Sequence, residues 1–142
     1  MKKLLLVLAI VVMASVALPM SALAADADVG TLEARGNGHA SLVGSMEFRA
    51  TADAGELVVT VHNRDTKVYI RGCREKVRLD NVIICHGFHG AAYVEGRQVE
   101  IELDGHSLKF QAKGHGRALL RGDGTYKLNG GEPQDWPADV AF

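Results

Sequence analysis

The stretch ICHGFHG gathers the residue types most able to carry chemistry in this chain. It places one cysteine and two histidines within five positions, at Cys85, His86 and His89. Thiolates and imidazoles are the ligands that zinc and copper prefer, and this spacing would let both imidazoles reach one ion from a turn. Three ligands are one fewer than a closed structural site needs, so His62 or His115 would be candidates for the fourth. One interpretation of the segment is therefore a Zn or Cu site.

Cys85 has a second interpretation, because the chain contains a second cysteine. Cys73 lies twelve residues earlier, and an even number of cysteines in an exported protein favours a disulfide. Closing a loop of this size stabilises a domain by about 2–3 kcal/mol. His86 and His89 would then lie in a solvent-exposed connector, where they could form a weak site without the thiol. The Cys73–Cys85 disulfide is favoured, with free thiols and metal ligation by Cys85 as the alternatives.

The beginning of the chain has the three zones of a secretory signal peptide. Lys2 and Lys3 precede an apolar run, and small residues surround Ala24. We expect cleavage after Ala24, which gives a signal peptide over residues 1–24 and a single domain over residues 25–142. The apolar run is short for a membrane span and no second long one follows, so we expect a soluble periplasmic or secreted protein.

Composition argues against nucleic acid as a partner and against a familiar enzyme. The 16 basic residues fall to 14 when Lys2 and Lys3 are removed, against 17 acidic ones, and the two signs are interspersed. Binding to a phosphate backbone relies on clustered Lys and Arg, which release counterions. The chain has no GxSxG elbow, HExxH, P-loop or dinucleotide fingerprint. We therefore expect a protein that is not an enzyme and needs no cofactor.

The most extensive pattern is a repeat of glycines and aliphatic residues. The frame GxGxAxLxG occurs at residues 36–44 and 114–122, and parts of it occur at residues 68–72 and 90–96. The closing glycines are Gly44, Gly72, Gly96 and Gly122, at separations of 28, 24 and 26 residues. This spacing predicts four units of about 26 residues that make up most of the domain.

Within each unit, apolar residues alternate with polar ones, which is the period of a half-buried strand. Val99, Ile101 and Leu103 illustrate the apolar side, and the intervening Glu100 and Glu102 illustrate the solvent side. After the signal peptide, no stretch keeps the helical period over three turns. The pattern predicts an all-β domain with two or three short strands in each unit.

Two arrangements fit this pattern. In a β-solenoid of the parallel β-helix type, each unit is one coil, like positions stack in parallel ladders, and the glycines lie at corners. In an antiparallel sandwich or barrel, the glycines would occupy hairpin turns such as residues 121–124. The constant frame favours the solenoid, with the antiparallel fold as the alternative. Residues 130–142, which hold Trp136 between Pro133 and Pro137, break the repeat and are expected to cap its last apolar layer.

The run from Gly114 to Tyr126 resembles small exported bacterial glycine-rich β-repeat proteins of unassigned function, whose sequences carry a GxGxAxLxGxGxY pattern. The match covers a short part of the domain, and the second unit departs from the pattern at Asp65 and Lys67. The resemblance implies export and an all-β repeat fold, and it implies no catalytic residues.

These features lead to three functional hypotheses. The first is an exported, non-enzymatic structural or adhesive module that binds an unknown component of the periplasm, cell envelope or cell surface, with self-association through strand edges as a further option. The second is a small extracytoplasmic metal-binding protein that uses Cys85, His86 and His89 for Zn or Cu. The third is a carbohydrate-active β-helix protein.

Overall fold

The computed structural model describes residues 29–142, and the predicted signal peptide lies outside them. The described residues form one eight-stranded antiparallel sheet. Its strands are β1 (Gly30–Ala52), β2 (Ala54–Thr60), β3 (Lys67–Arg71), β4 (Glu75–Leu79), β5 (Val82–His86), β6 (Gly90–Leu128), β7 (Gln134–Asp135) and β8 (Ala138–Ala141). The all-β prediction is confirmed. Within residues 29–142, nothing forms a helix with the length and hydropathy needed to cross a membrane.

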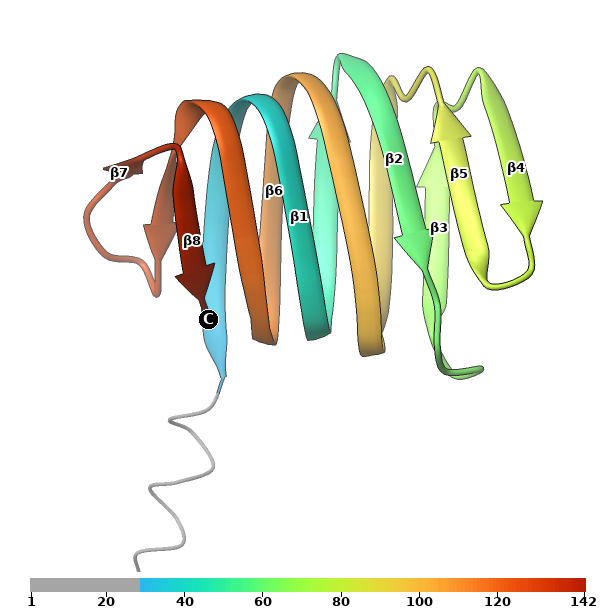
Figure 1. Cartoon of the computed structure of the whole chain (residues 1–142), viewed down its shortest axis with the longest axis horizontal. Coiled ribbons are helices and arrows are strands. Elements are labelled where there is room, and N and C mark those ends of the chain that lie inside the picture. The colour runs from blue at the N-terminus through green and yellow to red at the C-terminus, as the bar shows by residue number, and fades with distance from the viewer. Residues whose placement is uncertain (1–28) are drawn as a thin grey trace, which may run out of the picture.

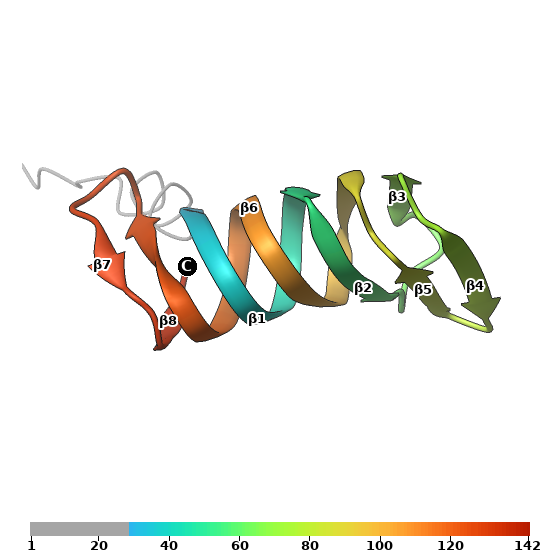
Figure 2. The same cartoon turned by 90° about the horizontal axis from the view of Figure 1, so that it is seen from above.

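Two strands, β1 and β6, are much longer than strands usually are, because they bend repeatedly without losing their pairing. Most residues of β1 pair with β6 on both sides. Ala40, for example, lies opposite Leu103 on one side and Leu120 on the other. β6 therefore passes β1 twice, and the two strands wind together into a coil (Figures 1 and 2).

The coil is flattened into two walls. The front wall, nearer the viewer in Figure 1, consists in order of β4, β5, β2, residues 99–105 of β6, residues 38–44 of β1, residues 116–122 of β6, and β8. The back wall consists in order of β3, residues 90–96 of β6, residues 46–52 of β1, residues 109–114 of β6, residues 30–36 of β1, residues 124–128 of β6, and β7. Each wall has one inner and one outer face, because successive side chains of a strand point to opposite sides.

The core lies between the two inner faces. Phe48 and Leu32 from the back wall, and Leu42 and Leu57 from the front wall, are completely buried. The Phe48 ring packs against the Phe110 ring at a centroid distance of 5.8 Å. Among the described residues, every buried side chain in the core is apolar. Burial of these side chains supplies the main driving force for folding, at about 25 cal/mol per Å² of apolar surface.

Glycines occupy the corners where the chain passes from one wall to the other. Gly38 and Gly122 face each other with φ angles of +137° and +113°. A Cβ atom on Gly38 would lie 2.2 Å from the carbonyl oxygen of Arg121, which no side chain could tolerate. Further corner pairs in close backbone contact are Gly36 with Gly124, Gly44 with Gly116, Gly55 with Gly105, and Gly72 with Gly90. Three of the four frame-closing glycines, Gly44, Gly72 and Gly122, therefore lie at corners of the coil.

The predicted parallel ladders are wrong, because every strand pairing among the described residues is antiparallel. The two best copies of the GxGxAxLxG frame, residues 36–44 and 114–122, are neighbours in the front wall that run in opposite directions. Both cross this wall from corner to corner, so both need glycines at their ends and small or aliphatic residues inside. Their similarity reflects a shared position in the coil and carries no information on strand direction.

The predicted 26-residue period is also wrong. Gly30 and Met46, sixteen residues apart, both pair with Gly114, so one turn of the coil takes sixteen residues of β1 at this point. Of the antiparallel alternatives, a sandwich or a barrel, the sandwich is consistent with the sheet, which does not close. Residues 121–124, however, continue as strand within β6 instead of forming a hairpin turn. The bend at these residues is a corner of the coil.

The two ends of the coil differ. At one end, Lys76 and Arg78 of the edge strand β4 lie opposite the inward-facing Cys85 and Ile83, so two cations line the open mouth of the coil. Inward-pointing charges on an edge strand discourage pairing with another chain. At the other end, β7 and β8 pair with β6, and Trp136 is buried in the core cluster.

Candidate functional site

The ICHGFHG segment contains one half of a disulfide. Cys73 and Cys85 are bonded, with an S–S distance of 2.10 Å and a Cα–Cα distance of 5.3 Å, as the sequence predicts. The bond links β5 in the front wall to the corner that follows β3 in the back wall. The Cys85 thiol is therefore not free to bind a metal, and the predicted ligand set of Cys85, His86 and His89 is corrected to the two histidines.

The candidate histidine ligands lie in different surroundings. His86 Nδ1 is 3.1 Å from Glu56 Oε2, whereas His89 Nδ1 is bonded to the backbone oxygen of Asp53. His62 lies 3.5 Å from Glu100, and His115 lies at a corner opposite Ser45. Within residues 29–142, no three His, Cys, Asp or Glu side chains come together as a metal site. Metal binding by His86 and His89 stays a prediction.

The outer face of the front wall carries a row in which two adjacent acids are flanked by a histidine on each side. The register places Glu56 opposite both His86 and Asp104, and Asp104 opposite His39. His39 Nδ1 lies 2.6 Å from Asp104 Oδ1, so each acid has a histidine as its partner on the side away from the other acid. These pairs are partly exposed to solvent, where an ion pair contributes about 0–1 kcal/mol. Each of these acids and histidines therefore already has a hydrogen-bond partner within the row.

The outer face of the back wall carries a different row, which runs across three adjacent strands. Tyr69 of β3 lies opposite Tyr93 of β6, which in turn lies opposite Arg49 of β1. The two tyrosine rings are 6.2 Å apart between centroids, and the Arg49 guanidinium lies 5.1 Å from the Tyr93 ring centroid. Two aromatic rings and a cation are thus stacked side by side on an exposed surface, with Tyr69 64% exposed.

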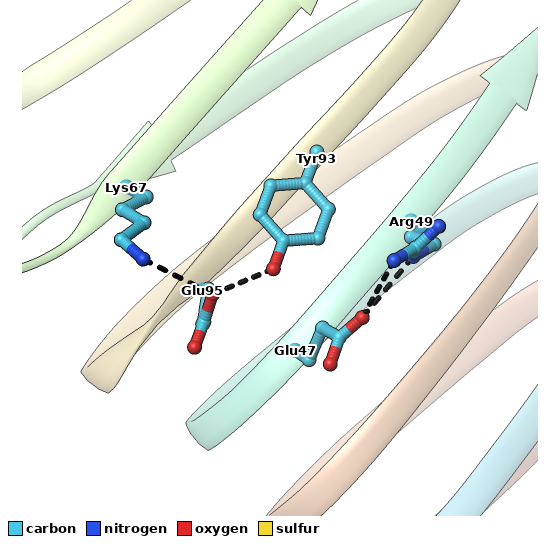
Figure 3. A network of polar contacts seen from close by, with 5 residues as sticks. All are labelled: Glu47, Arg49, Lys67, Tyr93 and Glu95. Atoms are coloured by element: carbon cyan, nitrogen blue, oxygen red, sulfur yellow. Dashed lines mark hydrogen bonds and ion pairs between the residues drawn. The ribbon is translucent and has the colours of Figure 1, made fainter.

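Two carboxylates bind two members of this row, Tyr93 and Arg49 (Figure 3). The Tyr93 hydroxyl donates a hydrogen bond of 2.6 Å to Glu95 Oε2, and Lys67 Nζ lies 3.9 Å from the same oxygen. Arg49 donates two hydrogen bonds to Glu47 Oε1, at 2.9 and 3.2 Å. Both side chains are therefore fixed before any ligand arrives, which reduces the entropy lost on binding.

The same contacts change the acidity of Tyr93. Its hydrogen bond to Glu95, together with partial desolvation and the charge of Glu47, raises the pKa of Tyr93 to about 12 from the usual 10.0. These effects all disfavour the tyrosinate. Tyr93 therefore keeps its proton, and its role as a donor to Glu95, throughout the neutral pH range.

A second row runs parallel to the first, two residues further along each strand. In strand order it consists of Arg71, Ala91, Thr51, Lys109 and Arg35. Between the two rows lies a groove of about 830 Å³, whose floor is made by the intervening residues of the same strands, including Ala50 and Ala92. The groove crosses the strands, because the rows that form its sides cross them.

The cations of the second row are available to a ligand. Among the described residues, Arg71, Lys109 and Arg35 have no carboxylate oxygen within 4.0 Å. Arg35 lies directly opposite Lys109, and like charges in that position are destabilising in a sheet. Glu33, two residues from Arg35 on the same strand, also lines the groove, but it accepts a hydrogen bond from Gln111 and forms no ion pair within 4.0 Å with either cation, so an anion between the two cations would be stabilising.

The groove is the functional feature that inspection of the sequence missed. The residues of its two sides come from β1, β3 and β6, and each of them has the spacing of an ordinary outward-facing strand residue. One signal was present: Tyr69 and Tyr93 each stand three residues before a frame-closing glycine, Gly72 and Gly96. This signal was not sufficient, because the two rings meet through the antiparallel register of β3 against β6.

No protein-family model, curated protein or solved structure matches this chain.

Proposed function

We propose that this protein is an exported, non-enzymatic binding module of the periplasm or cell envelope, with the coiled sheet as a solenoid-type scaffold. The observation that carries this proposal is the exposed row of Tyr69, Tyr93 and Arg49 on the back wall, in which Glu95 binds Tyr93 and Glu47 binds Arg49. A set of fixed aromatic and cationic groups on a continuous sheet is suited to binding a ligand over an extended surface.

The scaffold supports this role because it is stiff along the whole row. Tyr69, Tyr93 and Arg49 come from three strands that are hydrogen-bonded to one another and share one core. A site on paired strands keeps its geometry better than a site on loops. The spacing between binding groups is therefore set by the sheet.

Two features support the extracytoplasmic location. The predicted signal peptide, residues 1–24, lies outside the described residues, and the Cys73–Cys85 disulfide suits an oxidising compartment. The non-enzymatic character is supported by the exposed histidine–carboxylate pairs, His39 with Asp104 and His86 with Glu56, which lie on an open sheet face. A catalytic acid or base usually lies in a cleft that perturbs its pKa.

Export is tested by expressing the full chain in a bacterium with a periplasm and sequencing the N-terminus of the product. We expect soluble periplasmic protein that begins at Ala25 and contains no free thiol. A product that keeps residues 1–24 and stays in the cytoplasm would contradict the localisation.

Binding is tested by co-sedimentation of the purified protein with envelope fractions from the source organism. We expect the wild-type protein to sediment with at least one fraction, and a Tyr69→Ala, Arg49→Ala variant to remain in solution. A variant with the same number of changes on the front wall, Val43→Ala and Leu79→Ala, serves as the matched control because these side chains are also exposed. Failure of the wild-type protein to sediment with any fraction would overturn the proposal.

A further inference from the structure

We infer that the groove on the back wall binds a single extended chain of an acidic, uronate-type polysaccharide. This inference rests on the proposed function and names the class of ligand for that surface. Arg71, Lys109 and Arg35 would pair with the carboxylates of the polymer, and the tyrosine rings would pack against its sugar rings.

The shape of the groove favours a linear polymer. Its two sides are rows of side chains that continue across adjacent strands of the back wall, from β3 to residues 30–36 of β1. Neighbouring strands are about 4.8 Å apart, so equivalent side chains along a row repeat at that spacing. An extended sugar chain has a comparable rise per residue, so successive sugars could meet successive strands.

The charge of the groove favours an anion. Arg71, Lys109 and Arg35 lie along one side without carboxylate partners among the described residues, and Lys76 lines the groove as well. Glu33 is the one acid among the described residues that line the groove, so the cations outnumber the acids there. An anion placed between Lys109 and Arg35 would relieve the repulsion between these directly opposed cations. Carboxylates spaced along a polymer would satisfy several of these positions at once.

The aromatic groups favour a sugar over a simple polyanion. Tyr69 is 64% exposed and stands beside Tyr93 on the other side of the groove. An aromatic ring offers a flat apolar face with a polar hydroxyl at its end. The apolar face of a pyranose ring matches such a surface, whereas a carboxylate alone does not.

The acids that border the groove argue against duplex nucleic acid. Glu47 and Glu95 lie opposite each other two residues beyond Arg49 and Tyr93, which is about 7 Å along the strand. Their negative charges border the groove on the side of Tyr93 and Arg49. A duplex carries phosphates on both strands and would bring some of them against this border. A single polymer chain fits between the border and the far side of the groove.

The test is a calorimetric titration of the purified, disulfide-bonded protein with alginate oligosaccharides. Polyacrylate, dextran and an oligothymidylate are titrated in parallel: they supply carboxylates without sugars, sugars without charge, and a single-stranded nucleic acid. We expect alginate to bind best, with an affinity that falls as salt is added.

Matched variants locate the site. Arg71→Gln with Lys109→Gln should weaken alginate binding about tenfold or more, because two charge-assisted contacts are lost. Arg117→Gln with Arg121→Gln changes the net charge equally on the front wall and should leave binding unchanged. Tyr69→Ala, at an exposed position, should weaken alginate binding several-fold while binding of polyacrylate stays the same. Circular dichroism checks that each variant is folded.

Several results would overturn the inference. Alginate binding that is unaffected by Arg71→Gln with Lys109→Gln would place the site elsewhere, and equal binding of polyacrylate would show a non-specific polyanion surface. Tighter binding of oligothymidylate would assign the groove to nucleic acid, and a dimer that dissociates only in the groove variant would assign it to a second copy. If envelope fractions still bind in each case, the inference fails and the proposed function stands. If neither alginate nor any fraction binds, both fail.

Discussion

The front and back walls share strands, corners and core, yet their outer faces differ in chemistry. The back wall exposes the cations Lys67, Arg71, Arg49, Lys109, Lys113, Arg35 and Lys127, against the acids Glu33, Glu47, Glu95 and Asp135. The front wall exposes the acids Glu75, Glu56, Glu100, Glu102, Asp104 and Asp139, against the cations Arg117 and Arg121. The inner pattern is therefore fixed by packing, while the outer positions are free to differ and can carry function.

The two outer faces also differ in how their charges are used. On the front wall, the histidines and Arg117 pair with neighbouring acids, and the hydrogen bond from Arg117 lowers the pKa of Asp139. On the back wall, Arg49 pairs with Glu47 and Lys67 pairs with Glu95. Among the described residues, the cations of the second row have no such acidic partners. The unpaired row is the side of the groove that we assign to a ligand.

The largest expected effect comes from the core that both walls share. Phe48→Ala in the back wall should lower the free energy of unfolding by about 3–5 kcal/mol, and Leu42→Ala in the front wall by about 2–5 kcal/mol. Both side chains are completely buried. Urea unfolding followed by circular dichroism and by Trp136 fluorescence should give one coincident transition in each variant. Separate transitions would show that the walls fold independently.

A smaller effect on stability is expected from the Cys73–Cys85 disulfide, which links the two walls. Replacing both Cys73 and Cys85 by serine should lower the free energy of unfolding by about 2–3 kcal/mol, because the open loop gains entropy in the unfolded chain. The thermal midpoint of the double variant should match that of the reduced wild-type protein. An unchanged midpoint after full reduction would contradict the assigned contribution of the bond. Alginate binding should persist, because neither cysteine lines the groove.

The smallest effect concerns Tyr93. A spectrophotometric titration should show one tyrosine that ionises near pH 12, and Glu95→Gln should move that step toward pH 10. Because the folded-state pKa is raised, the associated stability is present below pH 10 and is lost as the pH rises through 12. Tyr93→Phe should remove the late step and Tyr69→Phe should not. A late step that survives Glu95→Gln would mean that the hydrogen bond is not its cause.

The sequence predicted the features that depend on local geometry. Alternation along residues such as Val99 to Leu103 predicted strands with one buried face, and the glycine spacing predicted corners. The Cys73–Cys85 bond was predicted from the even cysteine count together with the predicted signal peptide. Each of these depends on what one stretch of chain can do by itself.

Strand direction and register could not be predicted from the sequence. A frame such as GxGxAxLxG satisfies a corner-to-corner crossing equally well in either direction, so residues 36–44 and 114–122 looked like stacked copies when they are antiparallel neighbours. The groove depends on the same information, because Arg49 meets Tyr93 only through the register of β1 against β6. Outward-facing residues can be recognised as a site only when the neighbouring strands and their register are known.

In the coil, β1 lies between two stretches of β6, and NMR tests this arrangement most directly. Ser41 should show backbone proton contacts both to Glu102 and to Leu119, which lie opposite it on its two sides. Contacts to both, in the antiparallel pattern, are the result we predict. Contacts to only one of the two residues, or a parallel pattern, would contradict the coil and with it the two rows that form the groove.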